Sequence, residues 1–242
     1  MNPLRSAFAR LFLPDPAQAP DRPATMADLQ DAGGHVRAMV LMLRGPADWE
    51  PLRAVWRGVQ ADLGLPAPAI AVSGQDGLQL WFSAPAPVPA TQAHRFLEAL
   101  RQRYLPAVAR HRLVLWPGAD AASAPPAELA CVPAPQPDGS RWSAFVAADL
   151  APIFSETPWL DMPPSEDGQA KLLAALSSLP ADGLATSLAT LAPPAAAAPA
   201  GPAGPTAATP LADEPRAFLL RVMNDDSVPL ALRIEAAKAL LH

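Results

Sequence analysis

The chain has 242 residues, of which 32 are Pro, and a formal net charge of −5 at pH 7. Pro lacks a backbone N–H and fixes φ, so this content excludes an all-helical bundle and a coiled coil. The acidic balance argues against a general polyanion-binding surface, although a local basic patch stays open. The single cysteine, Cys131, excludes an internal disulfide and a cysteine-based zinc site.

Composition also divides the chain into parts. We expect residues 1–34 to be a poorly ordered N-terminal segment and residues 35–179 to be the main domain. Pro is dense in residues 180–213, where it prevents helix formation despite many Ala, so the sequence predicts an extended linker there. We expect residues 214–242 to be a separate C-terminal piece.

Strands and amphipathic helices alternate in the main domain in the order β-α-β-β-α-β. The apolar patterns predict strands at 36–43, 69–72, 78–82 and 113–116, and helices at 49–63 and 93–104, the second capped near Thr91. Pro85, Pro87 and Pro89 are expected to end the third strand. Further strands are predicted at 128–132 and 141–147, and a short helix at 169–179. The expected class is α+β, with an RNA-recognition-motif-like or ferredoxin-like core, extra strands and a C-terminal helical hairpin.

The most distinctive segment is residues 63–88, a β-hairpin whose turn contains Ser73, Gly74 and Gly77. Glycines in such a turn let backbone N–H groups approach a bound phosphate or a neighbouring chain. The alternative is an ordinary glycine-rich hairpin.

This hairpin resembles a motif of the archaeo-eukaryotic primase superfamily, which includes primase-polymerases. The resemblance covers residues 36–117, about a third of the chain, and is specific only at the motif. The matching residues are Leu63-Gly64-Leu65-Pro66, Ser73-Gly74, Gly77, Leu80-Trp81-Phe82 and Pro87-Val88. The resemblance implies a catalytic core of the RNA-recognition-motif type.

The catalytic residues that the resemblance calls for are missing. Active members place two aspartates at the end of the first strand, where this chain has residues 41–44 (LMLR), and a His where it has Gln79. The last strand, residues 113–116 (LVLW), supplies no carboxylate either. Two-metal nucleotidyl transfer needs oxygen ligands for the metal ions. We therefore expect no catalytic residues, no metal site and no cofactor, and a protein that has lost this activity.

Nucleic-acid binding could persist although nucleotidyl transfer is lost. Between His94 and Arg112 the chain has five arginines, Arg101 and Arg103 among them, against the single acid Glu98. With Arg44, these arginines could contact the phosphates of single-stranded nucleic acid. An exposed Trp81 beside Gln79 could stack on a base. The alternative is that the arginines are a solvated helix face and that Trp81 is packed under residues 125–147.

The C-terminal piece, residues 214–242, is predicted to form two short helices. Its sequence resembles helical hairpins of phage DNA-packaging small subunits and of HEAT-like repeats. The alternative is a generic hairpin that docks on a protein partner or on a second copy of the chain.

No run of about 18 residues is apolar and free of charge, Pro or Gly, so no membrane span is predicted. The first 14 residues lack an apolar core of signal-peptide length, and we expect a soluble, cytoplasmic protein.

Three functions follow from these patterns. The first is a non-catalytic nucleic-acid-associated protein with a degenerate primase-polymerase-like domain, carried by a mobile element or phage-related region. The alternative is a protein-interaction module without nucleic-acid binding. The third is a metal-dependent nucleotidyltransferase.

Overall fold

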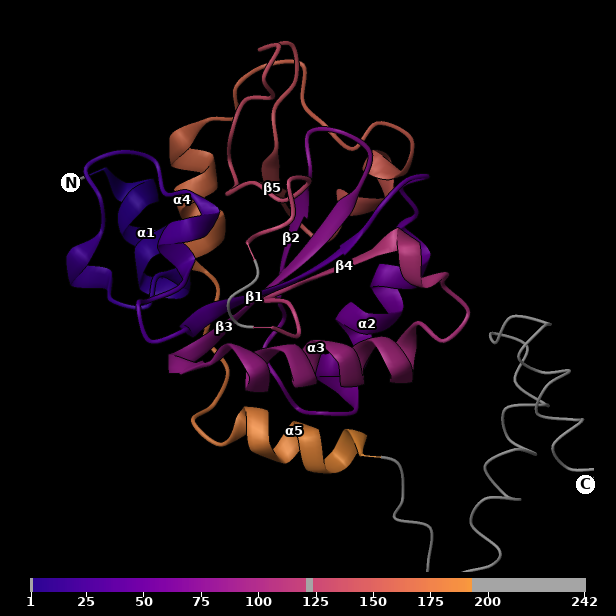
Figure 1. Cartoon of the computed structure of the whole chain (residues 1–242). Coiled ribbons are helices and arrows are strands. Elements are labelled where there is room, and N and C mark those ends of the chain that lie inside the picture. The colour runs from indigo at the N-terminus through magenta and orange to yellow at the C-terminus, as the bar shows by residue number, and fades with distance from the viewer. Residues whose placement is uncertain (1, 121–123, 193–242) are drawn as a thin grey trace, which may run out of the picture. The chain divides into compact units, whose positions relative to one another are not determined.

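The computed structural model describes residues 2–120 and 124–192, which share one hydrophobic core (Figure 1). The helices are α1 (Pro3–Phe12), α2 (Trp49–Ala61), α3 (Ala90–Tyr104), α4 (Glu166–Ala174) and α5 (Gly183–Leu191). The strands are β1 (His35–Leu43), β2 (Ala69–Val72), β3 (Leu78–Pro89), β4 (Leu113–Trp116) and β5 (Ala144–Val146). Short 3₁₀ turns occupy Pro16–Gln18, Met26–Leu29, Arg110–Arg112 and Ala151–Ser155.

The strands form one open antiparallel sheet in the order β4-β1-β3-β2-β5. The α+β class predicted from the sequence is confirmed. The four strands predicted from the clearest apolar runs are all present, as are the two amphipathic helices between them.

The sheet carries helices on both faces. Phe82 on β3 lies opposite Met39 on β1 and packs edge-on against Phe96 of α3, at 5.5 Å between ring centroids. Helices α2 and α3 cover this face (Figure 1). Side chains alternate along a strand, so the neighbouring Trp81 points to the opposite face, where it meets α1.

The N-terminal segment is ordered, so the prediction of disorder for residues 1–34 is wrong for residues 2–34. Asn2 caps α1 by accepting a hydrogen bond from the Leu4 N–H at 2.8 Å, and Pro3 stands in the first turn, where its missing N–H costs nothing. Helix α1 then packs against β1, β3 and α4. Its buried face consists of Leu4, Phe8, Ala9, Leu11 and Phe12.

The predicted linker at 180–213 is also wrong where the structure describes it. Residues 183–191 form α5, which packs against α3. Leu184 is buried, and Leu188 and Leu191 lie partly buried against the core, so the segment has enough apolar side chains to be held. The predicted hairpin at 214–242 lies outside the described residues.

Two boundaries differ from the predictions. Strand β3 continues past Phe82 to Pro89, because β1 pairs with it as far as Pro89. The edge of β3 that faces β2 has no strand partner beyond Trp81, so the prolines remove no ladder hydrogen bond on that side. Helix α3 begins after Pro89 without a side-chain cap, so Thr91 is not its cap.

The later elements are shorter than predicted or absent. Residues 128–132 form no strand. Leu129, Cys131 and Val132 are nevertheless buried, so the apolar run that predicted a strand reflects packing in the core. Only three residues of the predicted strand at 141–147 pair with β2. The predicted helix at 169–179 is α4, which starts earlier because Ser165 caps it. Within the described part of the chain, every helix is too short or too polar to span a bilayer.

Candidate functional site

The Ser73–Gly77 turn uses its polar groups internally. The Ser73 Oγ accepts hydrogen bonds from the Gly77 N–H at 2.9 Å and the Gln75 N–H at 3.1 Å. The Gly74 N–H donates to the Pro158 carbonyl at 2.9 Å, and the Ser73 N–H to the Gly77 carbonyl at 2.9 Å. The donors expected to hold a phosphate therefore already have partners in the protein.

Both glycines are explained by close packing. A Cβ on Gly77 would lie 2.6 Å from the Leu43 carbonyl oxygen at the end of β1. Gly74 has φ +83°, and a Cβ there would lie 2.8 Å from the Ser143 nitrogen. Glycine is needed at both positions because a neighbouring backbone segment passes too close for a side chain.

The expectation that Trp81 is exposed is wrong. Its side chain and that of Gln79 are each 1% exposed, and the Trp81 Nε1–H donates to the Gln79 Oε1 at 2.8 Å. The rings of Phe12, Phe145 and Phe8 pack edge-on against the indole at centroid distances of 5.2, 5.9 and 6.1 Å. The alternative prediction was that Trp81 packs under residues 125–147. This is correct for the contact with Phe145, but the other two rings, Phe8 and Phe12, come from α1.

Three of the candidate arginines, Arg44, Arg101 and Arg112, have partners within the protein. Arg44 forms an ion pair with Glu128 at 3.2 Å. Arg112 donates to the backbone carbonyls of Arg44 and Pro46, the second at 2.8 Å, and so ties the start of β4 to the end of β1. Arg101 contacts both carboxylate oxygens of Glu98 and holds the pKa of that carboxyl below its usual value.

The candidate residues therefore fall into separate places. Gly77, Arg44 and Arg112 meet at the end of the sheet where β1 stops. Arg101 and Arg103 lie in the last turn of α3, and the Arg103 side chain is exposed. Gln79 and Trp81 are inside the core.

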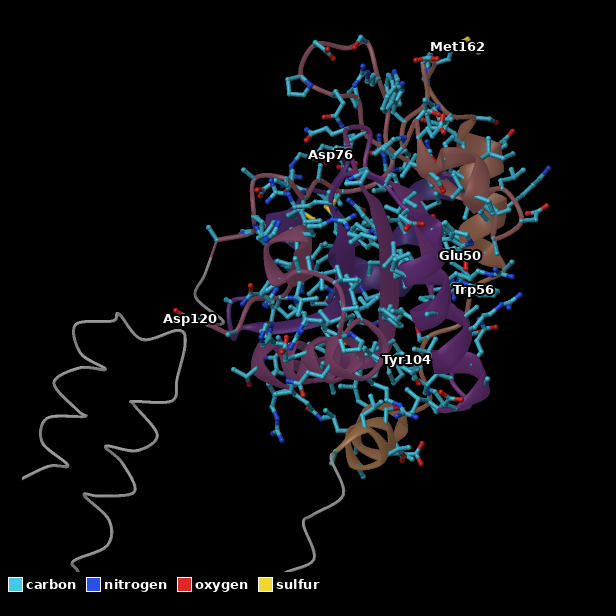
Figure 2. All side chains as sticks on the ribbon, turned by 90° about the vertical axis from the view of Figure 1, so that its right-hand side faces the viewer. Glu50, Trp56, Asp76, Tyr104, Asp120 and Met162 are labelled. Atoms are coloured by element: carbon cyan, nitrogen blue, oxygen red, sulfur yellow. The ribbon has the colours of Figure 1, made fainter. Side chains whose placement is uncertain are left out.

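Carboxylates are dispersed. Asp48 caps α2 by accepting from the Glu50 N–H, and Glu50 pairs with Arg53 at 2.9 Å. Asp76 and Glu50 lie on separate parts of the surface (Figure 2). Among residues 2–120 and 124–192, no three His, Cys, Asp or Glu side chains gather closely enough to hold a metal ion.

The concavity that sequence reasoning missed lies beside α1. It has a volume of about 390 Å³ and is lined by α1, residues 19–24, residues 131–135 and Trp142, among others. Apolar residues of α1 recur at helical spacing, a signal that could have revealed this wall had the segment not been assigned as disordered. No family model, curated protein or solved structure matches the chain.

Substitution of Gly74 tests whether this glycine is required for packing. Gly74→Ala should lower the free energy of unfolding in urea by about 2–4 kcal/mol, from the left-handed backbone plus the collision with residues 142–143. Gly139→Ala is the matched control, because Gly139 has φ +70° and open space around it, and should cost about 1–2 kcal/mol. Equal losses in the two variants would contradict the packing role of Gly74.

Proposed function

We propose that this chain is a non-catalytic protein-interaction module built on a degenerate, primase-like core of the RNA-recognition-motif type. The strand order β4-β1-β3-β2 supports the core, because the split β-α-β arrangement has this order with both helices on one face. The hairpin motif at residues 63–88 supports the primase-like origin. The phage-related origin suggested by residues 214–242 stays a prediction.

The observation that carries the proposal is the filled sheet face. Modules of the RNA-recognition-motif type bind single strands on the open face of the sheet, by stacking bases on its aromatic side chains. In this chain α1 lies on that face, and Trp81 is buried beneath Phe8 and Phe12. A base cannot reach the indole unless α1 leaves the sheet.

A thiol and a carboxylate that catalysis could use are already engaged within the fold. Burial raises the pKa of the Cys131 thiol to about 12, so almost no thiolate exists at neutral pH. The Asp48 carboxylate is used as a helix cap. These features favour binding over chemistry.

A surface for a protein partner lies on the turn after β5. Leu150 is 45% and Ile153 is 67% exposed, and the Ile153 N–H donates to the Leu150 carbonyl, so the two side chains belong to one turn. Single exposed apolar residues are common, but two on one turn make a small apolar patch of the kind that interfaces use.

A second candidate is nucleic-acid binding outside the sheet. Arg95 and Arg103 are exposed on α3, and within the described part of the chain neither forms an ion pair. Two exposed guanidinium groups on one helix could contact a phosphate backbone.

Fluorescence anisotropy separates the two candidates. The full chain should not bind labelled single-stranded DNA or RNA oligonucleotides at low salt, because the aromatic face is covered. Salt-sensitive binding that is lost in Arg95→Ala/Arg103→Ala, but kept in the control Arg53→Ala, would establish the second candidate instead.

The apolar patch gives the positive test. A photo-crosslinking amino acid at position 153 should form an adduct of one defined mass with a protein in cells, and Leu150→Asp should abolish it. The same crosslinker at the exposed position of Asp138 is the control. Equal adducts at both positions, or no effect of Leu150→Asp, would contradict a specific interface at this turn.

A further inference from the structure

The cavity beside α1 has the size and lining of a small-molecule site. Its volume of about 390 Å³ falls in the usual range for ligand pockets, roughly 300–1,000 Å³. Its walls come from segments far apart in the chain, which the core holds in place. Six of the lining residues are prolines, namely Pro20, Pro23, Pro133, Pro135, Pro163 and Pro164.

The prolines determine what can lie against these walls. A proline ring is rigid and apolar and carries no N–H, so the walls are poor in hydrogen-bond donors. An extended peptide would leave backbone carbonyl groups unpaired here, which is costly. Phe8 and Trp142 add aromatic surface. The body of a ligand that fits is therefore aliphatic or aromatic, without polar groups along its length.

One cation on the wall is available for a ligand. The Arg5 guanidinium has five N–H donors, and one of them donates to the Asp21 carbonyl at 2.5 Å. Within the described residues Arg5 forms no ion pair. By contrast, Arg22 donates through both terminal nitrogens to Asp28, at 2.7 and 2.9 Å, and holds the pKa of that carboxyl far below its usual range.

The one acid on the wall is engaged with a neighbour. Glu166 accepts a hydrogen bond from the Asn2 Nδ2 at 2.6 Å. The second Asn2 side-chain atom, Oδ1, caps α1. Arg5 has further N–H groups that can donate to a ligand, whereas Glu166 already accepts a hydrogen bond from Asn2. This arrangement favours an anionic head group over a cationic one.

We propose that this cavity binds a small amphipathic carboxylic acid, such as a medium-chain fatty acid. The carboxylate lies against Arg5 and the hydrocarbon body lies between Phe8, Trp142 and the prolines. No covalent step is involved, because the buried Cys131 thiol on the wall stays protonated. The site does not depend on the interaction surface at Ile153.

Calorimetric titration of the full chain with decanoate tests the site. Decanoate should bind saturably at one site, and decanol about tenfold or more weakly, because charge-assisted hydrogen bonds to Arg5 are lost. Arg5→Gln should weaken decanoate binding by a similar factor and leave decanol binding unchanged. Arg141→Gln is the control, because Arg141 stacks on Trp159 and does not line the cavity.

A second variant tests the apolar wall. Ala134→Leu places extra carbons in the cavity and should weaken decanoate and decanol alike, while thermal unfolding followed by circular dichroism shows that the chain is folded. Absence of saturable decanoate binding to the unaltered chain would overturn the proposal. So would decylamine that binds as tightly as decanoate, or an Arg5→Gln variant with unchanged affinity for decanoate. The crosslinking at position 153 is unaffected by any of these results.

Discussion

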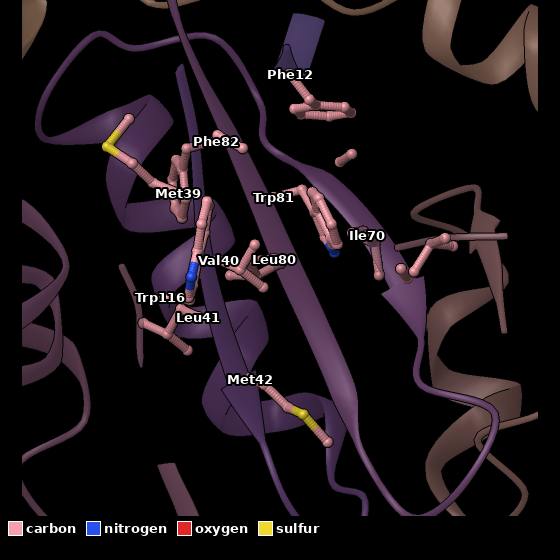
Figure 3. Close-up of a cluster of buried hydrophobic side chains, with 14 of the residues drawn as sticks. Phe12, Met39, Val40, Leu41, Met42, Ile70, Leu80, Trp81, Phe82 and Trp116 are labelled. Atoms are coloured by element: carbon pink, nitrogen blue, oxygen red, sulfur yellow. The ribbon is translucent and has the colours of Figure 1, made fainter. Parts of the chain in front are cut away.

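The packing of α1 on Trp81 is the interaction on which the rest of the structure depends. Phe12 packs edge-on against the indole in the core cluster (Figure 3), and Phe8 packs beside Phe12. This contact closes the sheet face opposite α2 and α3. Helix α1 in turn holds α4, because Arg10 donates to the carbonyls of Leu173 and Leu176 at the end of α4. Helix α1 also forms part of the cavity wall, together with residues 131–135.

Buried polar groups of the sheet fix the end of α1. The last carbonyls of a helix lack partners within the helix. The Ser83 Oγ donates to the Leu11 carbonyl at 2.5 Å, and the Arg37 Nη1 reaches the Leu13 carbonyl at 3.4 Å. Arg37 is 8% exposed, its Nε donates to the Ala84 carbonyl, and burial lowers its pKa. A sheet with an open face would expose these polar side chains to water, whereas here they anchor a helix.

Hydrophobic patterns predicted the parts of the fold whose burial is simple. A continuous apolar run gave β1, which is buried on both faces, and a helical repeat gave α2, which buries one face, so both types and nearly both sets of ends were predicted. Helices α1 and α5 were missed because neighbouring prolines and alanines hid their short apolar faces, and tertiary contacts hold them. At the candidate site, the glycines of the hairpin were recognisable as special. Sequence could not show that backbone from residues 142–143 and from β1, not a phosphate, requires them.

Hydrogen exchange of the Trp81 indole N–H, followed by NMR on the full chain, tests directly whether α1 covers the sheet. We expect this signal, assigned with Trp81→Phe, to persist long after that of Trp159 has exchanged. Trp81 is buried and bonded to Gln79, whereas the Trp159 indole donates to Asp161 at an exposed position. If the two indole signals disappeared together, α1 would not cover the sheet, and the face would be open to a base.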